Sequence, residues 1–174
     1  MLRILLASLI VLGASSPAFA DKKCDSKIHA KILFRASFAY DRGCMFDALV
    51  VKGKSYDDVT AATPKAMAVL GWKKAKDAKR EELAMMWITD VLARAGEYRV
   101  VYSTNDGNSA DFKKRFFEPK TTTKDGAVTI RYWRDETMIG MQEPTTRDFV
   151  ETEVTFDANG ALTVSDVSTF AEPF

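Results

Sequence analysis

The sequence has few of the residue types on which metal centres and nucleophilic sites depend. It contains one histidine, His29, and two cysteines, Cys24 and Cys44, in 174 residues. A zinc site needs three or four His, Cys or carboxylate ligands, and Ser–His catalysis would have to rest on His29 alone. A C-x-x-C redox pair and an H-E-x-x-H motif are also missing. We therefore expect no metal and no cofactor, and the sequence identifies no catalytic residue.

Phosphate-binding and calcium-binding loops are missing too. No Walker phosphate loop and no G-x-S-x-G motif is present. The polar stretch from Asn105 only superficially suggests a calcium loop. The sixth position, which needs Gly, holds Ala110, and the twelfth, which needs Glu, holds Phe116. We interpret residues 105–108 as a turn.

The chain lacks the positive charge that nucleic-acid-binding domains use. Removing residues 1–20 takes away one of its 25 basic residues and none of its 24 acidic residues, which leaves 24 of each sign. We therefore expect no nucleic-acid partner. The charges are unevenly placed, since residues 134–174 contain nine acidic and two basic residues. The basic run from Lys73 to Arg80 is interrupted by Asp77, and we interpret it as a solvated face.

The N-terminal residues have the pattern of a secretory signal peptide. Arg3 is followed by an uncharged apolar stretch over residues 4–13, and Ala18-Phe19-Ala20 offers small residues at a cleavage site. A membrane-spanning helix needs about 20 apolar residues, and this stretch is shorter. We expect cleavage after Ala20, a periplasmic location without stable membrane insertion, and a single domain over residues 21–174.

The two cysteines predict a disulfide. An even number of cysteines in an exported chain is typical of a structural bridge, because the compartment is oxidising. We therefore expect Cys24 to pair with Cys44.

The spacing of apolar residues predicts helices mainly in the first half of the chain and strands mainly in the second. We expect helices over residues 28–40, 64–75, 77–95 and 109–117, and a short helical turn over 55–62. A buried strand is the alternative for 28–40. We expect strands over 45–51, 98–103, 128–133, 138–142, 150–156 and 162–170, with a polar loop over 119–126 and turns over 143–146 and 157–160. Thr63, Asp77 and Ser109 are the predicted helix N-caps, with Pro64 as the first residue after Thr63.

This order predicts an α+β fold in which N-terminal helices pack on a curved, mostly antiparallel sheet. The order is similar to that of the cone-shaped folds of the cystatin and nuclear-transport-factor kind. The similarity concerns architecture alone, so it implies no function.

One strand face is a candidate binding surface. Arg131 and Trp133 alternate with the apolar residues of 128–132, so both point to the opposite face of the predicted strand. If that face is open, Trp133 with Arg131 and Arg134 would bind a partner.

Our preferred hypothesis is an exported, non-enzymatic accessory or binding protein for a protein partner or an apolar small molecule. One alternative is a pocket enzyme that uses carboxylates such as Asp135 or Glu136 as acid and base. Another is an exported inhibitor or immunity protein. The sequence gives no oligomeric state.

Overall fold

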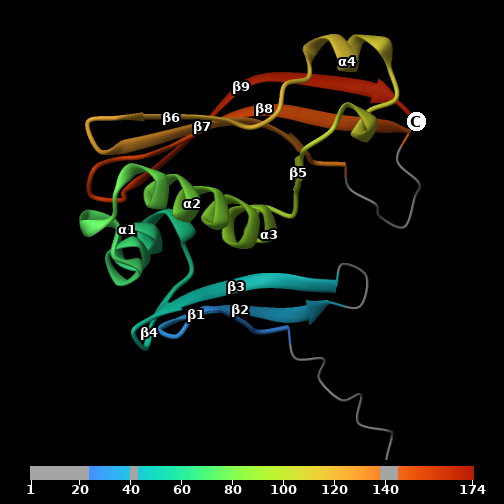
Figure 1. The fold of residues 1–174 in the computed structure, drawn as a ribbon. Coiled ribbons are helices and arrows are strands. Elements are labelled where there is room, and N and C mark those ends of the chain that lie inside the picture. Colours follow the sequence, from blue (N-terminus) through green and yellow to red (C-terminus); the bar gives the residue numbers. More distant parts are fainter. Residues whose placement is uncertain (1–23, 40–42, 138–144) are drawn as a thin grey trace, which may run out of the picture.

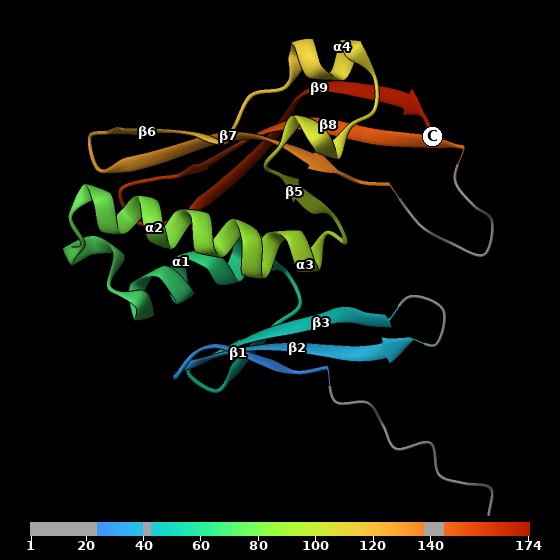
Figure 2. The same ribbon diagram turned by 45° about the vertical axis from the view of Figure 1, so that its right-hand side comes forward.

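A layer of helices lies between two antiparallel sheets, and one further short helix covers the outer face of the second sheet (Figures 1 and 2). The computed structural model describes residues 24–39, 43–137 and 145–174. The predicted α+β class is confirmed, but the chain forms two sheets where we expected one. None of the helices in these three ranges has the length and apolar character needed to cross a membrane.

The first sheet includes the described part of the segment 28–40, for which we expected a helix and named a buried strand as the alternative. Its strands are β1 (Ser26–His29), β2 (Ile32–Ala39), β3 (Gly43–Val51) and β4 (Lys54–Tyr56), paired in chain order. The helix prediction for 28–40 is wrong, because Ile32, Phe34 and Ala36 are buried alternately on one face and pair with β3. The strand predicted over 45–51 is confirmed as β3.

The middle layer is a helical segment that contacts both sheets. It contains α1 (Val59–Leu70), a 3-10 turn η1 (Trp72–Lys74), α2 (Asp77–Trp87), a π-helical turn η2 (Ile88–Leu92) and α3 (Ala93–Ala95). Helix α1 contacts β3 and β9, while α2 contacts β6 and β7. Helix α3, which follows the π turn, contacts β3 and β5.

The start of α1 differs from the prediction. Asp58 is its N-cap and accepts a hydrogen bond from the Thr60 amide, while Thr63 and Pro64 lie inside the helix. The Thr63 hydroxyl is fully buried, donates to the Val59 carbonyl and accepts from the Trp87 indole. Thr63 is therefore a satisfied core residue.

Other predicted boundaries of helices and turns also differ from the observed ones. Lys76 is the N-cap of α2, and Asp77 is its first residue. Residues 55–62 are divided between β4 and the start of α1. Residues 105–108 contain a 3-10 turn, η3 (Thr104–Asp106), and Ser109 caps α4 (Ala110–Arg115) as predicted.

The second sheet comes from the C-terminal half. Its strands are β5 (Arg99–Val101), β6 (Lys120–Lys124), β7 (Ala127–Asp135), β8 (Thr146–Phe156) and β9 (Leu162–Pro173). β5 and β6 both pair with β7, which pairs with β8, and β8 pairs with β9. The polar loop predicted over 119–126 is wrong, because β6 and β7 form a hairpin around Asp125 and Gly126. The strand predicted over 138–142 falls outside the described residues.

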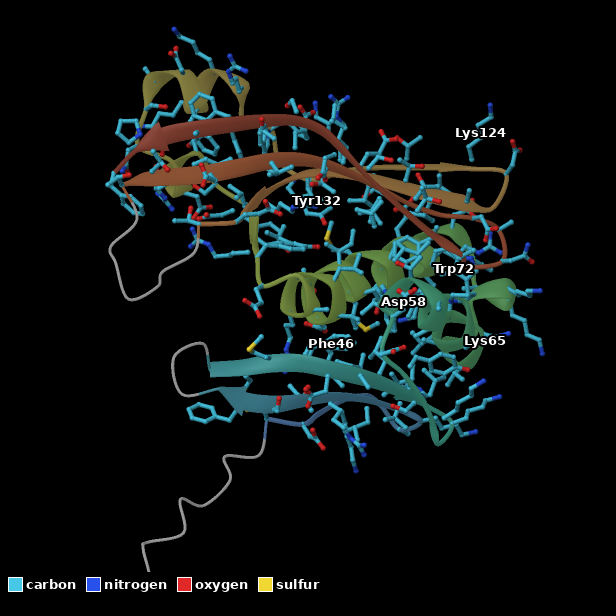
Figure 3. The ribbon with its side chains drawn as sticks, turned by 180° about the vertical axis from the view of Figure 1, so that it is seen from behind. Phe46, Asp58, Lys65, Trp72, Lys124 and Tyr132 are labelled. Atoms are coloured by element: carbon cyan, nitrogen blue, oxygen red, sulfur yellow. A yellow bond between two sulfur atoms is a disulfide. The ribbon has the colours of Figure 1, made fainter. Side chains whose placement is uncertain are left out.

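Two hydrophobic cores hold these layers together. The larger core joins the helices to both sheets, and Figure 3 shows Phe46 and Tyr132 on opposite sides of the helix layer. The smaller core lies on the other face of the second sheet, under α4, and contains Phe112, Trp133 and Phe149. The predicted disulfide joins Cys24 to Cys44, with a Cα–Cα distance of 5.5 Å. It fastens the chain before β1 to β3.

Candidate functional site

The strand face that we expected to be open is covered. Trp133 points away from Tyr132, as predicted, but only 2% of its surface is exposed. The rings of Phe112 and Phe117 lie 6.3 and 6.1 Å from the Trp133 ring. A ligand therefore reaches this indole only if α4 moves.

The two predicted arginines lie on opposite faces of the second sheet. Arg131 forms an ion pair with the buried Glu151, which also accepts a hydrogen bond from Ser168. The Arg134 guanidinium forms ion pairs with Glu136 at 2.7 Å and with Asp166 at 3.1 Å. Arg131, Trp133 and Arg134 therefore do not share one accessible surface, and a binding role for either arginine stays a prediction.

The carboxylates named for acid–base chemistry belong to ion-pair networks. Asp135 accepts hydrogen bonds from Arg99 at 2.9 Å and from Arg147 at 3.2 Å. Burial favours the protonated acid, but hydrogen bonds from Thr137 and Arg99, with the Arg147 charge, lower the pKa of Asp135 overall. Asp135 is therefore ionised at neutral pH and is not poised to donate a proton.

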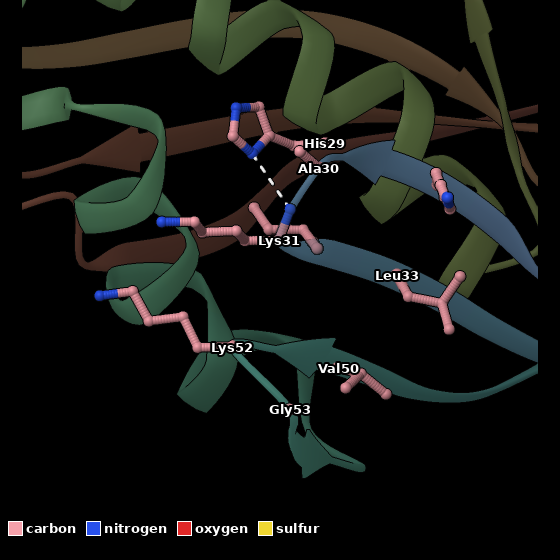
Figure 4. A pocket seen from close by; sticks show the side chains of 9 residues that line it. His29, Ala30, Lys31, Leu33, Val50, Lys52 and Gly53 are labelled. Atoms are coloured by element: carbon pink, nitrogen blue, oxygen red, sulfur yellow. Dashed lines mark hydrogen bonds between the residues drawn. The ribbon is translucent and has the colours of Figure 1, made fainter.

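A pocket on the first sheet is lined by basic and apolar side chains. It has a volume of about 360 Å³ and opens at the hairpin end of β1, β2 and β3 (Figure 4). Its lining includes Lys27, His29, Lys31 and Lys52 around the half-buried Leu33 and Val50, and it includes no acidic residue. This volume is within the range of small-molecule sites.

Two tight turns bring the lysines together. Lys31 follows β1 in the β1–β2 turn, and Lys52 lies in the β3–β4 turn, where Lys52 and Gly53 have φ angles of 51° and 82°. The Lys52 amide donates to the Lys31 carbonyl at 3.0 Å. In Figure 4 both side chains extend in the same direction, away from Leu33 and Val50. The turns thus concentrate positive charge at one end of the pocket.

His29 has a defined orientation beside these lysines. Its Nδ1 accepts a hydrogen bond from the Lys31 amide at 3.4 Å (Figure 4). In the neutral ring Nε2 therefore carries the proton and is available as a donor.

The pocket lysines have no carboxylate partner among the described residues. No ion pair within 4.0 Å joins Lys27, Lys31 or Lys52 to an acidic side chain there, and among the described lysines only Lys79 and Lys114 form one. Unpaired ammonium groups around an apolar floor can attract a carboxylate or phosphate whose apolar part rests on Leu33 and Val50. No cluster of His, Cys, Asp and Glu in the described ranges has the arrangement of a metal site.

Sequence reasoning missed this pocket. Lys27, Lys31 and Lys52 come from segments that pair only when the first sheet forms, and our helix prediction for 28–40 hid that pairing. A Lys-Gly pair between Val51 and Lys54 was the available turn signal. Comparison with protein-family models, with curated proteins and with solved structures finds no match to this chain.

Proposed function

We propose that this protein is an exported, non-enzymatic binding protein whose pocket on the first sheet takes an anionic small molecule with an apolar part. One observation carries the proposal: Lys27, Lys31 and Lys52 line the same pocket as Leu33 and Val50, and none of the three has a carboxylate partner in the described chain. A ligand carboxylate or phosphate supplies the missing negative charge. The apolar part of the ligand covers two half-buried side chains.

The electrostatic contribution to binding is modest and depends on salt. All three lysines are exposed, and an exposed ion pair contributes about 0.2–1 kcal/mol. Screening reduces this contribution as ionic strength rises. We therefore expect weak binding that weakens further in salt, as suits a carrier or accessory protein that releases its ligand.

Two observations support export. Residues 1–20 have the signal-peptide pattern, and Cys24 forms a disulfide with Cys44, as is typical of proteins in oxidising compartments. The intact mass of the protein recovered from the periplasm of a bacterial host checks this. We expect a chain that begins at Asp21 and carries the disulfide. A full-length chain in the cytoplasm would contradict export.

The ligand proposal is tested with octanoate as the probe. Calorimetric titration at low ionic strength should detect binding, and Lys31→Met with Lys52→Met should weaken it about fivefold or more, because each exposed pair contributes up to about 1 kcal/mol. The matched control is Lys65→Met with Lys113→Met, which removes two exposed lysines outside the pocket and should change nothing. Equal weakening by the control, or no binding of octanoate, would overturn the pocket assignment.

A further inference from the structure

The outer face of the first sheet is the side that points away from the helix layer. Figures 1 and 2 show helices on one side of this sheet and no described helix or strand on the other. Leu33 and Val50 are direct cross-strand neighbours on the outer face, and both line the pocket. Arg35 is exposed and lies two residues from Leu33 along β2, so it shares this face, whereas Phe34 between them points into the larger core.

The positive charge of the described chain is concentrated in the first sheet. Its strands and their described turns, over residues 26–39 and 43–56, contain one acidic side chain, Asp47, and five basic ones: Lys27, Lys31, Arg35, Lys52 and Lys54. Asp47 lies at the end of the sheet away from the β1–β2 and β3–β4 turns, where it accepts a hydrogen bond from the Ser37 hydroxyl at 2.9 Å.

The rest of the described chain has no such surplus. Residues 57–97, which contain the helix layer, carry seven basic and seven acidic side chains. Residues 98–137 and 145–174, which contain the second sheet and α4, carry nine basic and twelve acidic side chains. A positive surplus on one side of a molecule orients that side toward a negatively charged partner.

A charged surface suits these side chains better than a partner that needs exact contacts. Lys27, Lys31, Arg35 and Lys52 are all exposed. Attraction of basic side chains to an anionic membrane depends on how much charge lies near the surface, so long and flexible side chains contribute without a fixed geometry. Leu33 and Val50 are half-buried, so they offer little apolar surface for insertion into the bilayer.

We propose that the outer face of the first sheet docks reversibly on the anionic surface of a lipid bilayer. Lys31 and Lys52 at the turns, with Lys27 and Arg35 on the strands, contact the lipid headgroups. The pocket lies on the same face, so docking holds it against the headgroups. This inference goes beyond the proposed function, because docking needs the basic face and does not require that the pocket bind a free ligand.

The test measures cosedimentation with lipid vesicles of the protein recovered from the periplasm of a bacterial host. At low ionic strength we expect binding to vesicles of equal parts phosphatidylglycerol and phosphatidylcholine, and no binding to phosphatidylcholine alone. Binding should be lost in about 1 M salt, where charges are screened beyond about 3 Å.

Two sets of variants locate the docking face. Lys31→Gln with Lys52→Gln should weaken binding to the anionic vesicles about thirtyfold, because each basic side chain near such a surface contributes about fivefold. Arg35→Gln should weaken it about fivefold and leave octanoate binding unchanged, because Arg35 does not line the pocket. The matched control, Lys113→Gln with Lys114→Gln, removes two exposed lysines from α4 and should keep the wild-type binding. Circular dichroism checks that the variants keep the fold.

The outcomes separate this inference from the proposed function. If octanoate binds and the anionic vesicles do not, docking is overturned while the pocket stands. Docking by this face is also overturned if the control weakens vesicle binding as much as the pair Lys31→Gln and Lys52→Gln, or if phosphatidylcholine vesicles bind equally well. If the vesicles bind as expected and octanoate does not, docking stands and the pocket function is overturned.

Discussion

The Arg80 guanidinium donates a hydrogen bond to the Gly126 carbonyl at 2.9 Å, which links helix α2 to the β6–β7 turn. The same guanidinium donates to the backbone carbonyl of Trp72 at 3.1 Å and to that of Lys73 at 3.4 Å. Only 13% of the Arg80 side chain is exposed. One residue of the basic run that we interpreted as a solvated face therefore holds the helix layer against the second sheet.

Replacing Arg80 by Lys should lower the free energy of unfolding by about 1–2 kcal/mol. An ammonium cannot reproduce the fork of donors that reaches three carbonyls, and hydrogen bonds to charged groups are the stronger kind. Urea denaturation measures the change. The control is Lys79→Met, because Lys79 is exposed and should shift the midpoint very little. Equal effects of the two substitutions would contradict a bridging role.

Gly107→Ala should destabilise the small core under α4. A Cβ at Gly107 would lie 2.1 Å from Phe112 Cδ1, and the Phe112 ring is fully buried against Phe149 at a centroid distance of 4.3 Å. We expect a loss of about 1–3 kcal/mol, which is typical of overpacking. In a Phe112→Ala background the same substitution should cost less, because alanine lacks the Cγ and Cδ1 atoms that would lie 2.5 and 2.1 Å from the new Cβ. An equal cost in both backgrounds would exclude this steric explanation.

Protonation of Glu172 should make the protein less stable in acid. Its carboxylate accepts from the Asn108 amide at 2.7 Å and from the Ser109 amide at 2.8 Å. Burial opposes ionisation, but these hydrogen bonds and the Arg147 charge lower the pKa of Glu172 below its ordinary 4.5. The unfolded chain therefore binds the proton first. The stabilisation is complete above about pH 4.5 and is lost as the pH falls through the folded pKa.

Denaturation of Glu172→Gln at several pH values checks this. The variant should be less stable at neutral pH and should lose less stability between neutral pH and acid than the wild type. Glu118→Gln replaces an exposed carboxylate and should keep the wild-type pH dependence. A pH dependence unchanged by Glu172→Gln would contradict the prediction.

Removing the disulfide should lower the free energy of unfolding by about 3 kcal/mol. The bridge spans 20 residues of sequence, and a closed loop of that length restricts the unfolded chain by about this amount. The double variant Cys24→Ser with Cys44→Ser measures the loss. Reductant should destabilise the wild type to a similar degree and leave the variant unaffected. Equal stability of the variant and the oxidised wild type would contradict it.

The tryptophan fluorescence should resist quenching by iodide in the native state. Trp72 and Trp87 are fully buried, and Trp133 is 2% exposed. These are the three tryptophans of the chain. Iodide should therefore quench the native emission weakly and the denatured emission strongly. Substantial native quenching that disappears in Trp133→Phe would show that α4 opens and that the predicted binding face is accessible.

Sequence patterns predicted the strands whose two faces differ most. Val128, Ile130 and Tyr132 alternate with more polar residues, and β7 lies where this alternation predicts it. The segment over 28–40 fits a helical spacing and a strand alternation equally. Its pairing with β3 and its contact with the helix layer decide between them, and a local pattern contains neither. β6 was recognisable, because three Thr residues precede the Asp125-Gly126 turn.

The candidate site was less predictable than the fold. Alternation placed Trp133 on the correct face of its strand, but the covering by α4 depends on the contact of Phe112 with Phe149, which are far apart in sequence. The pocket lysines are spread over three segments, and the register of β1, β2 and β3 brings them together. That register requires a sheet that we did not predict.

Each sheet is built from one continuous stretch of the chain, which has a consequence for the order of assembly. All pairings of the first sheet are complete by Tyr56, and they join strands adjacent in sequence. The first sheet can therefore form early, since local contacts form fastest. The contact between α1 and β9 joins segments far apart in sequence and must wait for the last strand. Leu162 of β9 belongs to the same core as Ile32 and Leu49 of the first sheet, so the final strand completes a core that both sheets share.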